Sequence, residues 1–270
     1  MNIFSYSKQT ISNDDIKNVT KILKSNYLTQ GPTINLFEKK VSKFVNAKYA
    51  VAINSATSGL HLGCLALGLK KKDYLWTVPN SFVASANCGL YCDANIDFVD
   101  IDNNTWNIDV NLLSQKLRKT KKNKLPKILV VVHFAGEPAN TDKIYRLSKK
   151  YKFKIIEDAS HALGSRLNKN KIGDCKFSNL TVFSFHPVKP ITTGEGGMVT
   201  TNNKILYNKL KSLRSHGIEK KQNTLKNKLW FYEQKYLGFN YRMNEIEASL
   251  GISQLKKINS FSEKRNKLAK

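Results

Sequence analysis

The stretch Ile128–Val132, which reads Ile-Leu-Val-Val-Val, decides the class of fold. An uninterrupted aliphatic run of this length is typical of a strand that is buried on both faces of a parallel sheet. Farther along the chain, the residue pattern predicts a helix over 144–150 and a second strand over 153–156. Strand, helix and strand in this order form the unit of a parallel sheet, so the centre of the chain predicts an α/β fold.

The same alternation continues on both sides of this unit. Further strands are predicted over 49–53, 76–78, 97–100, 180–184 and 196–201, and further helices over 13–23, 34–44, 60–69, 204–213 and 244–258. The last helix is predicted to run on to the C-terminus. We therefore expect a three-layer α/β/α domain with a mostly parallel mixed sheet, in which ligands bind at the carboxyl ends of the strands.

The composition restricts the class of function. The 270 residues carry a formal net charge of +25, which by itself favours a nucleic-acid binder. However, 39 of the 45 basic residues are dispersed lysines, whereas base recognition relies on arginine. No apolar run approaches the ~18 residues of a membrane span, and the N-terminus lacks a secretory signal. We expect a cytoplasmic protein that binds neither nucleic acid nor a membrane.

The cysteines give no indication of a metal site. The chain has four of them, Cys64, Cys88, Cys92 and Cys175. Cys88 and Cys92 are separated by three residues, and no second pair of Cys or His at ligand spacing follows. We expect reduced thiols that act as small core residues, and no bound metal.

Two segments that follow predicted strands could bind a charged ligand. Residues 54–58, Asn-Ser-Ala-Thr-Ser, precede a helix, where free N–H groups and hydroxyls suit a phosphate; an ordinary helix cap is the alternative. Glu157 and Asp158 end another strand, and His161 lies three residues beyond Asp158. A carboxylate there can hold a buried cationic nitrogen; a helix cap or a structural ion pair is the alternative.

Two later segments are also candidates. Lys189 lies between Pro187 and Pro190 in a loop that leads into a Gly-rich turn. A lysine in a desolvated pocket has a lowered pKa and can form a Schiff base; the alternative is one more surface lysine. The segment 237–244 contains Asn240 and a second asparagine, and either could simply cap a helix.

Taken in order, these segments predict one kind of chemistry. A phosphate site, an aspartate at a strand end and a lysine about thirty residues later are the parts that a pyridoxal phosphate site requires. The aspartate keeps the pyridine nitrogen of the cofactor protonated. The lysine carries the cofactor's aldehyde and then acts as acid and base. The sequence therefore predicts pyridoxal 5'-phosphate as the cofactor.

The chain carries four motifs in a fixed order: Asn-Ser-x-Thr-Ser-Gly-Leu (54–60), Glu-Asp-Ala-Ser-His-Ala-Leu-Gly (157–164), Phe-Ser-Phe-His-Pro-x-Lys-Pro-x-Thr-x-Gly-Glu-Gly-Gly (183–197) and Gly-x-Asn-Tyr-Arg (238–242). Together they resemble the DegT/DnrJ/EryC1/StrS family of sugar aminotransferases. The resemblance covers nearly the whole chain. It implies the large domain of a fold-type I pyridoxal phosphate enzyme.

The resemblance also implies roles for single residues. Lys189 binds the cofactor, Asp158 pairs with its pyridine nitrogen and His161 lies near its phenolic oxygen; these three are the expected catalytic residues. Phe82 stacks on the cofactor ring, a contact worth about 0.5–1.5 kcal/mol. The cofactor phosphate is bound by a further set, of which the last reaches over from a neighbouring subunit: Thr57, Ser58, Ser184 and Asn240.

The resemblance extends to the reaction. The segments Lys-Pro-Ile-Thr-Thr (189–193) and His-Phe-Ala-Gly-Glu-Pro (133–138) are most similar to the members of pseudaminic acid biosynthesis. Those members aminate C4 of a UDP-linked 4-keto-6-deoxy-N-acetylhexosamine, with glutamate as donor. We therefore expect an aminotransferase of nucleotide sugars, a homodimer with shared active sites, in which His133 and Glu137 face the substrate. Some members carry His in place of the lysine and act as dehydratases, so Lys189 favours transamination.

The end of the chain departs from the family pattern. We expect residues 1–250 to form the cofactor-binding domain, with 1–30 packing at a domain junction, and 251–270 to begin a helix that connects to a small C-terminal domain, largely absent here. Closing the site and orienting the substrate supply much of catalysis. The alternative to an active aminotransferase is therefore a truncated, non-catalytic cofactor-binding or scaffold protein.

Overall fold

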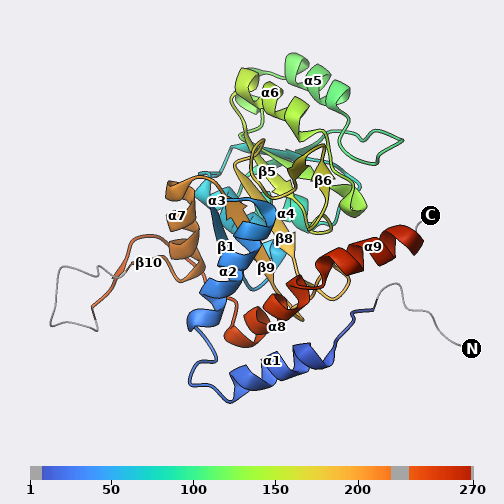
Figure 1. Cartoon of the computed structure of the whole chain (residues 1–270). Helices are drawn as coiled ribbons and strands as arrows, with labels where there is room; N and C mark the ends of the chain where they lie inside the picture. The colour runs from blue at the N-terminus through green and yellow to red at the C-terminus, as the bar shows by residue number, and fades with distance from the viewer. Residues whose placement is uncertain (1–7, 220–230, 269–270) are drawn as a thin grey trace, which may run out of the picture.

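A seven-stranded sheet runs through the computed structural model, which describes residues 8–219 and 231–268 (Figure 1). In the order β1-β9-β8-β5-β4-β2-β3, β9 alone is antiparallel to its neighbours, and the other strands are parallel to one another. The strands are β1 (Tyr49–Ile53), β2 (Tyr74–Thr77), β3 (Asn95–Phe98), β4 (Ile128–Val132), β5 (Lys154–Asp158), β8 (Leu180–Ser184) and β9 (Gly197–Thr201). The predicted α/β fold with a mostly parallel mixed sheet is thereby confirmed.

The aliphatic run that predicted this fold is the strand β4. All five of its residues are buried, because β2 and β5 flank it and helices cover both of its faces. Val130 packs in the same core as helices α3 (Ala56–Ala66) and α4 (Ala84–Leu90), while Val131 packs with helix α5 (Val110–Lys119) on the other face. Burial on both faces explains why the run has no alternation of polar residues.

The helices form the two outer layers. Helices α3, α4 and α7 (Lys204–Arg214) cover one face of the sheet. The other face is covered by α2 (Pro32–Val45), α5, α6 (Thr141–Tyr151) and α8 (Glu245–Leu255). The shorter elements are the 3-10 turns η1 (Lys122–Lys124) and η2 (Phe134–Gly136) and the hairpins β6 (Arg166–Leu167) with β7 (Asn170–Lys171) and β10 (Ile218–Glu219) with β11 (Glu233–Gln234). The described chain has no helix that is both long enough and apolar enough to cross a membrane.

Two predictions of local structure are wrong. Residues 54–58 were predicted to precede a helix over 60–69, but α3 already begins at Ala56, because the Ser55 side chain caps it by accepting the Ser58 N–H. The helix predicted to run from 244 to the C-terminus is broken at 256–257 into α8 and α9 (Ile258–Leu268). At the end of α8, the Lys257 N–H donates to the carbonyl three residues earlier, that of Gln254 (3.0 Å), which is the spacing of a 3-10 turn.

The N-terminal helix α1 (Asn13–Leu23) lies along α8 (Figure 1). Its buried Asp15 accepts hydrogen bonds from Lys257 and from Gln254 Nε2 (2.9 Å), so the two ends of the described chain are tied together. The predicted division of the chain at residue 250 and the packing of 1–30 at a domain junction stay predictions. Of that segment, residues 1–7 lie outside the described residues.

Candidate active site

A cavity of about 750 Å³ opens at the carboxyl ends of β4, β5 and β8. This is where ligands bind in open α/β sheets. Six residues that the sequence predicted for the site line it together, although they are spread over more than a hundred positions: Thr57, Phe82, Asp158, His161, Ser184 and Lys189. The fold therefore gathers most of the predicted site into one place.

Asp158 is held in a fixed orientation at the end of β5. It is only 6% exposed. Its Oδ1 accepts hydrogen bonds from the Ser160 hydroxyl (2.6 Å) and N–H (3.2 Å), and its Oδ2 accepts one from the Ser85 hydroxyl (2.6 Å). A carboxylate has about four acceptor positions. The three bonds leave one on Oδ2 for a donor from the cavity.

The Ser85 hydroxyl is itself oriented by a neighbour. Since its single proton is donated to Asp158, the bond of 3.1 Å between the Ser81 and Ser85 hydroxyls must run from Ser81 to Ser85. Ser85 lies on α4 and is almost wholly buried, whereas Ser81 lines the cavity. The result is a directed chain of hydrogen bonds that ends at the carboxylate.

Lys189 and His161 form a close pair on the wall of the cavity. Lys189 Nζ lies 2.6 Å from His161 Nε2. Burial lowers the pKa of Lys189, although the carboxylate of Asp158 partly offsets this effect. Burial and the charge of Lys189 likewise lower the pKa of His161. The imidazole is therefore neutral at neutral pH, and its Nε2 accepts the hydrogen bond that the lysine donates.

The N-terminus of α3 presents donors to the cavity. Ser55, Ala56 and Thr57 line it, and within the described residues the N–H groups of Ala56 and Thr57 have no acceptor. Gly197, the first residue of β9, lies next to this end of α3. A Cβ at position 197 would lie 2.8 Å from the Ala56 nitrogen, so the lack of a side chain there allows α3 to begin this close to β9. Free N–H groups at a helix N-terminus favour an anion such as a phosphate.

Two of the predicted cofactor residues lie outside the cavity lining. The Ser58 hydroxyl is engaged within α3, where it donates to Asn54 Oδ1 (2.7 Å) and bonds with the Ser55 hydroxyl (2.9 Å). Asn240 is exposed, in a strand-like bridge with Ser215. The structure therefore does not bring these two together with the other six.

The two residues expected to face the substrate differ in position. His133 lines the cavity, but both of its ring nitrogens are used inside the protein. Its Nδ1 accepts the Ala139 N–H (3.0 Å), so Nε2 carries the proton that bonds to Glu157 Oε2 (2.8 Å). Glu137 is exposed and does not line the cavity. Neither residue offers a free polar group to the cavity.

The aromatic side chain predicted to stack on the cofactor stands at the rim. Phe82 is 76% exposed and lines the cavity beside Asn80 and Ser81. An aromatic ring left this exposed in a cavity is a ready surface for a planar ligand. Phe134, in the turn η2 that follows β4, also lines the cavity and stacks on Trp106 with ring centroids 6.0 Å apart.

Sequence reasoning missed the residues that hold the predicted ones. Ser160 could have been found, because a side chain two residues after an aspartate often bonds to it. Ser85 is separated from Asp158 by 73 positions, and Arg265 donates from α9 to the carbonyls of Lys189 and Pro190 (both 3.2 Å). No local sequence pattern predicts contacts between residues this far apart in the chain. They depend on how the helices pack.

Comparisons with known proteins find relatives of the whole described chain. Residues 9–270 match the model of the DegT/DnrJ/EryC1/StrS aminotransferase family. The chain is 44% identical to the UDP-4-amino-4,6-dideoxy-N-acetyl-beta-L-altrosamine transaminase of Campylobacter jejuni over 99% of this chain and 68% of that relative.

Two solved structures are similar to this one. The first is Helicobacter pylori PseC, an aminotransferase involved in the biosynthesis of pseudoaminic acid (TM-score 0.85, 37% identity, 95% of this chain and 66% of that one). The second is the PLP-form of the putative sugar aminotransferase Spr1654 from Streptococcus pneumoniae (TM-score 0.85, 27% identity, 95% and 67%). The chain thus spans about two thirds of the length of these relatives.

Proposed function

This chain belongs to the DegT/DnrJ/EryC1/StrS aminotransferase family, and from that membership we propose that it transfers an amino group from glutamate to a nucleotide-linked 4-keto-6-deoxy sugar, with pyridoxal 5'-phosphate as cofactor. The observation that carries the proposal is one cavity that holds a half-buried amine, Lys189, a buried carboxylate, Asp158, and the free N–H groups of a helix N-terminus. These are the groups that such a cofactor needs.

The residues fit the cofactor in charge and in kind. Lys189 is the amine that would bind its aldehyde, and Asp158 Oδ2 has an acceptor position left for its pyridine N–H. Thr57, Ser184 and the start of α3 would hold its phosphate, and Phe82 would cover its ring. When bound, pyridoxal phosphate supplies an aldehyde that takes up an amino group and a ring that withdraws electrons from the bond being broken.

The Lys189–His161 pair has the geometry for proton transfer. A hydrogen bond of 2.6 Å joins the Lys189 amine, whose pKa is lowered, to the neutral imidazole of His161. His161 Nε2 can therefore accept a proton directly from Lys189 Nζ. A neutral Nζ can attack an aldehyde and can later remove a proton from a bound substrate. Asp158, with its fixed hydrogen bonds, would hold the pyridine nitrogen of the cofactor.

The names of the relatives support a nucleotide sugar as the substrate. The transaminase of Campylobacter jejuni is named for a UDP-linked amino sugar, and we infer a UDP-linked N-acetylhexosamine of the pseudaminic acid route for this chain. We further infer a cytoplasmic homodimer. Because Asn240 is exposed and lies outside the cavity of its own chain, we assign it to the cofactor phosphate of the neighbouring subunit.

The test is a titration of the apoprotein with pyridoxal phosphate, followed by visible absorbance. Wild type is expected to give a saturable band, and Lys189→Ala is expected to lack it. The control is Lys209→Ala, which removes a lysine that donates to the Ala66 carbonyl (3.2 Å) and does not line the cavity. A band of equal strength in Lys189→Ala would refute the assignment of that lysine.

A second step separates an aminotransferase from a non-catalytic cofactor-binding protein. Glutamate is added to the loaded protein, and the formation of 2-oxoglutarate and the change of the band are recorded. Conversion, followed by amination of an added UDP-linked 4-keto sugar, supports the proposal. A saturable band without conversion by glutamate supports the alternative, namely a scaffold that binds the cofactor only.

A further inference from the structure

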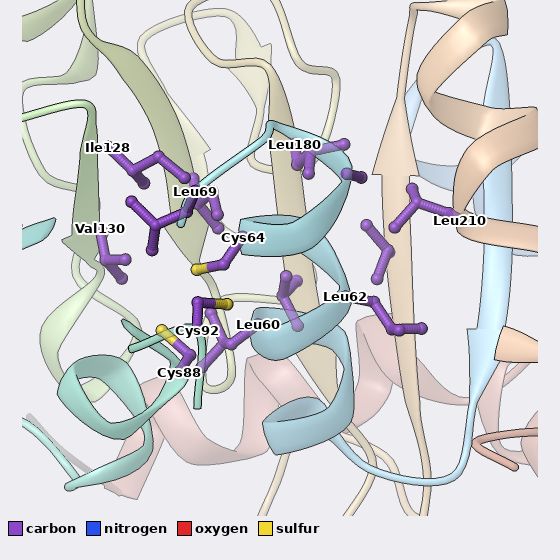
Figure 2. Close-up of a cluster of buried hydrophobic side chains, with 14 of the residues drawn as sticks. Leu60, Leu62, Cys64, Leu69, Cys88, Cys92, Ile128, Val130, Leu180 and Leu210 are labelled. Atoms are coloured by element: carbon purple, nitrogen blue, oxygen red, sulfur yellow. The ribbon is translucent and has the colours of Figure 1, made fainter. Parts of the chain in front are cut away.

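Three thiols converge in the core behind the cavity. Cys64 lies on α3, Cys88 lies on α4, and Cys92 follows the end of α4. The three belong to one core cluster, and Figure 2 shows their side chains gathered where the two helices meet. Interactions with both of the others raise the pKa of the Cys64 thiol. The active site proposed above uses none of the three.

Cys92 is distinguished from its neighbours by what surrounds it. His61, one turn before Cys64 on α3, is buried, and its Nδ1 bonds with the Tyr241 hydroxyl (3.3 Å). His61 also interacts with Cys92 and favours its thiolate form. Cys92 is also 8% exposed, whereas Cys64 and Cys88 have no exposed surface. A small molecule from the solvent would therefore meet Cys92 first.

The hydrogen bonds favour a thiolate at this position. The bond from Cys64, opposed by burial but aided by His61, lowers the pKa of Cys92 to about 6, although the charge of Asp93 acts against it. The same contacts raise the pKa of Cys64 well above its usual value. A low-pKa thiolate beside a second, protonated thiol is the arrangement of redox-sensitive cysteines.

The fourth cysteine provides a contrast within the same chain. Cys175 is buried, and burial raises its pKa to about 12 although the hydroxyls of Thr181 and Thr200 contact its sulfur. The other three cysteines share a core cluster to which Cys175 does not belong. A thiol in such a place is inert until the protein unfolds.

We propose that Cys92 and Cys64 form a peroxide-reactive thiol pair, in which Cys92 is oxidised first and Cys64 then closes a disulfide between α3 and the end of α4. Among the residues that the structure describes, no group of three or more His, Cys, Asp or Glu side chains is placed to hold a metal ion. The proposal therefore concerns the chemistry of the thiols themselves.

The reaction balances with hydrogen peroxide as the oxidant. The Cys92 thiolate attacks one peroxide oxygen, the O–O bond breaks, and hydroxide leaves with a sulfenic acid remaining on Cys92. The Cys64 sulfur then attacks the Cys92 sulfur and releases the sulfenic oxygen. The Cys64 proton and one further proton complete two waters. The two sulfurs together lose two electrons, which the peroxide gains.

The position of the pair connects it to the cavity. Helix α3 presents Thr57 to the cavity at its other end, and α4 carries Ser85, which bonds to Asp158. A disulfide would tie together these two helices, both of which contribute residues to the proposed cofactor site. Oxidation of the pair is therefore expected to change how readily the apoprotein takes up pyridoxal phosphate.

The test is peptide mapping of the native wild-type protein by mass spectrometry after mild treatment with hydrogen peroxide. We expect a cross-linked peptide pair that contains Cys64 and Cys92, with Cys175 unmodified. In a parallel measurement at neutral pH, iodoacetamide is expected to label Cys92 at least about tenfold faster than Cys175. Because both measurements use the unaltered chain, they do not depend on whether a variant folds.

Variants then assign the two sulfurs. Cys92→Ser and Cys64→Ala are each expected to abolish the cross-link, and Cys175→Ser is the matched control that keeps it. Cys64→Ala is also expected to slow the iodoacetamide labelling of Cys92, because it removes the main interaction that lowers the pKa of that thiol. Equal labelling rates for Cys92 and Cys175 would overturn the proposal. So would oxidation of native Cys92 to a sulfinic acid without any bond to Cys64.

Discussion

Glu157 and Asp158 are neighbours on β5 that face opposite sides of the sheet, and the structure treats them differently. Both are buried, 4% and 6% exposed. Glu157 is enclosed by the protein: its Oε2 bonds with His133 Nε2 (2.8 Å) and its Oε1 accepts the Thr181 hydroxyl (3.2 Å). Asp158 is held by two serines and keeps one acceptor position toward the cavity.

The difference shows how a buried carboxylate becomes either structural or functional. Burial alone would raise the pKa of Glu157, but the hydrogen bonds from His133 and from hydroxyl groups hold it below its usual value. The hydrogen bonds from His133 and Thr181 already satisfy the Glu157 carboxylate, so it needs no ligand. Asp158 has a fixed orientation and one acceptor position without a donor, which a cationic ligand would fill. Replacing each residue should therefore disturb a different property.

The largest effect is expected from Asp158→Asn. The amide keeps the shape but removes the negative charge that would hold a pyridine N–H. We expect transamination to fall on the order of 10²–10³-fold, as for the loss of a preorganised charge partner, with little change in the free energy of unfolding. Turnover with glutamate and a denaturant titration measure the two. A variant with wild-type turnover would contradict the role of Asp158.

Glu157→Leu should show the opposite pattern. It leaves the buried donors of His133 and Thr181 without acceptors, so the free energy of unfolding should fall by about 3 kcal/mol. The lowered pKa also has a consequence in acid. Wild type loses the contribution of Glu157 as pH falls from 4.5 through the lower pKa of the folded state, and the variant should lack this dependence. Denaturant titrations at several pH values test both, and an unchanged affinity for pyridoxal phosphate serves as control.

Ser85→Ala tests how far Asp158 depends on its support. The carboxylate would lose the hydroxyl bond of 2.6 Å on Oδ2, the oxygen with the free position. We expect the dissociation constant of pyridoxal phosphate to rise about tenfold, as for one hydrogen bond to a charged group. Ser148→Ala is the matched control, because its buried hydroxyl donates only to the Tyr145 carbonyl (2.7 Å). Equal affinities in the two variants would exclude a role for Ser85.

The smallest effect is a shift in pH dependence. A lysine reacts with an aldehyde only as the neutral amine, so the rate at which the apoprotein takes up pyridoxal phosphate should rise with pH. Because burial lowers the pKa of Lys189, the midpoint should lie below 10.5, the usual value for lysine. Stopped-flow absorbance over a pH series measures it. A midpoint at or above that value would show that the cavity does not desolvate the amine.

Much of the fold could be predicted because its signals are local. The run Ile128–Val132 predicted a central strand, and it is β4. Asn244 caps α8 through a capping box with Glu247, a pattern contained within four residues. The break between α8 and α9 could not be predicted, since it accompanies contacts of Lys257 with α1, more than two hundred positions away.

The sequence by itself determined which chemical groups the site contains. Asp158 ends a buried strand, and His161 and Lys189 each follow one. Because the carboxyl ends of parallel strands lie at one edge of the sheet, the strand pattern of the sequence already implies that these residues meet there. The same strand pattern placed Glu157 on the opposite side of the sheet from Asp158.

Only the tertiary structure decided how those groups are held and which of them are free. Ser85 reaches Asp158 because α4 packs beside β5, Ser58 is turned inward to Asn54, and His133 has both nitrogens bonded inside the protein. The number of hydrogen bonds that a side chain can make is a property of the residue. Whether its donors and acceptors already have partners inside the protein depends on the neighbours that packing brings close. For this reason the sequence predicts the candidate site residues, whereas only the folded structure shows which of them have polar groups free to bind a ligand.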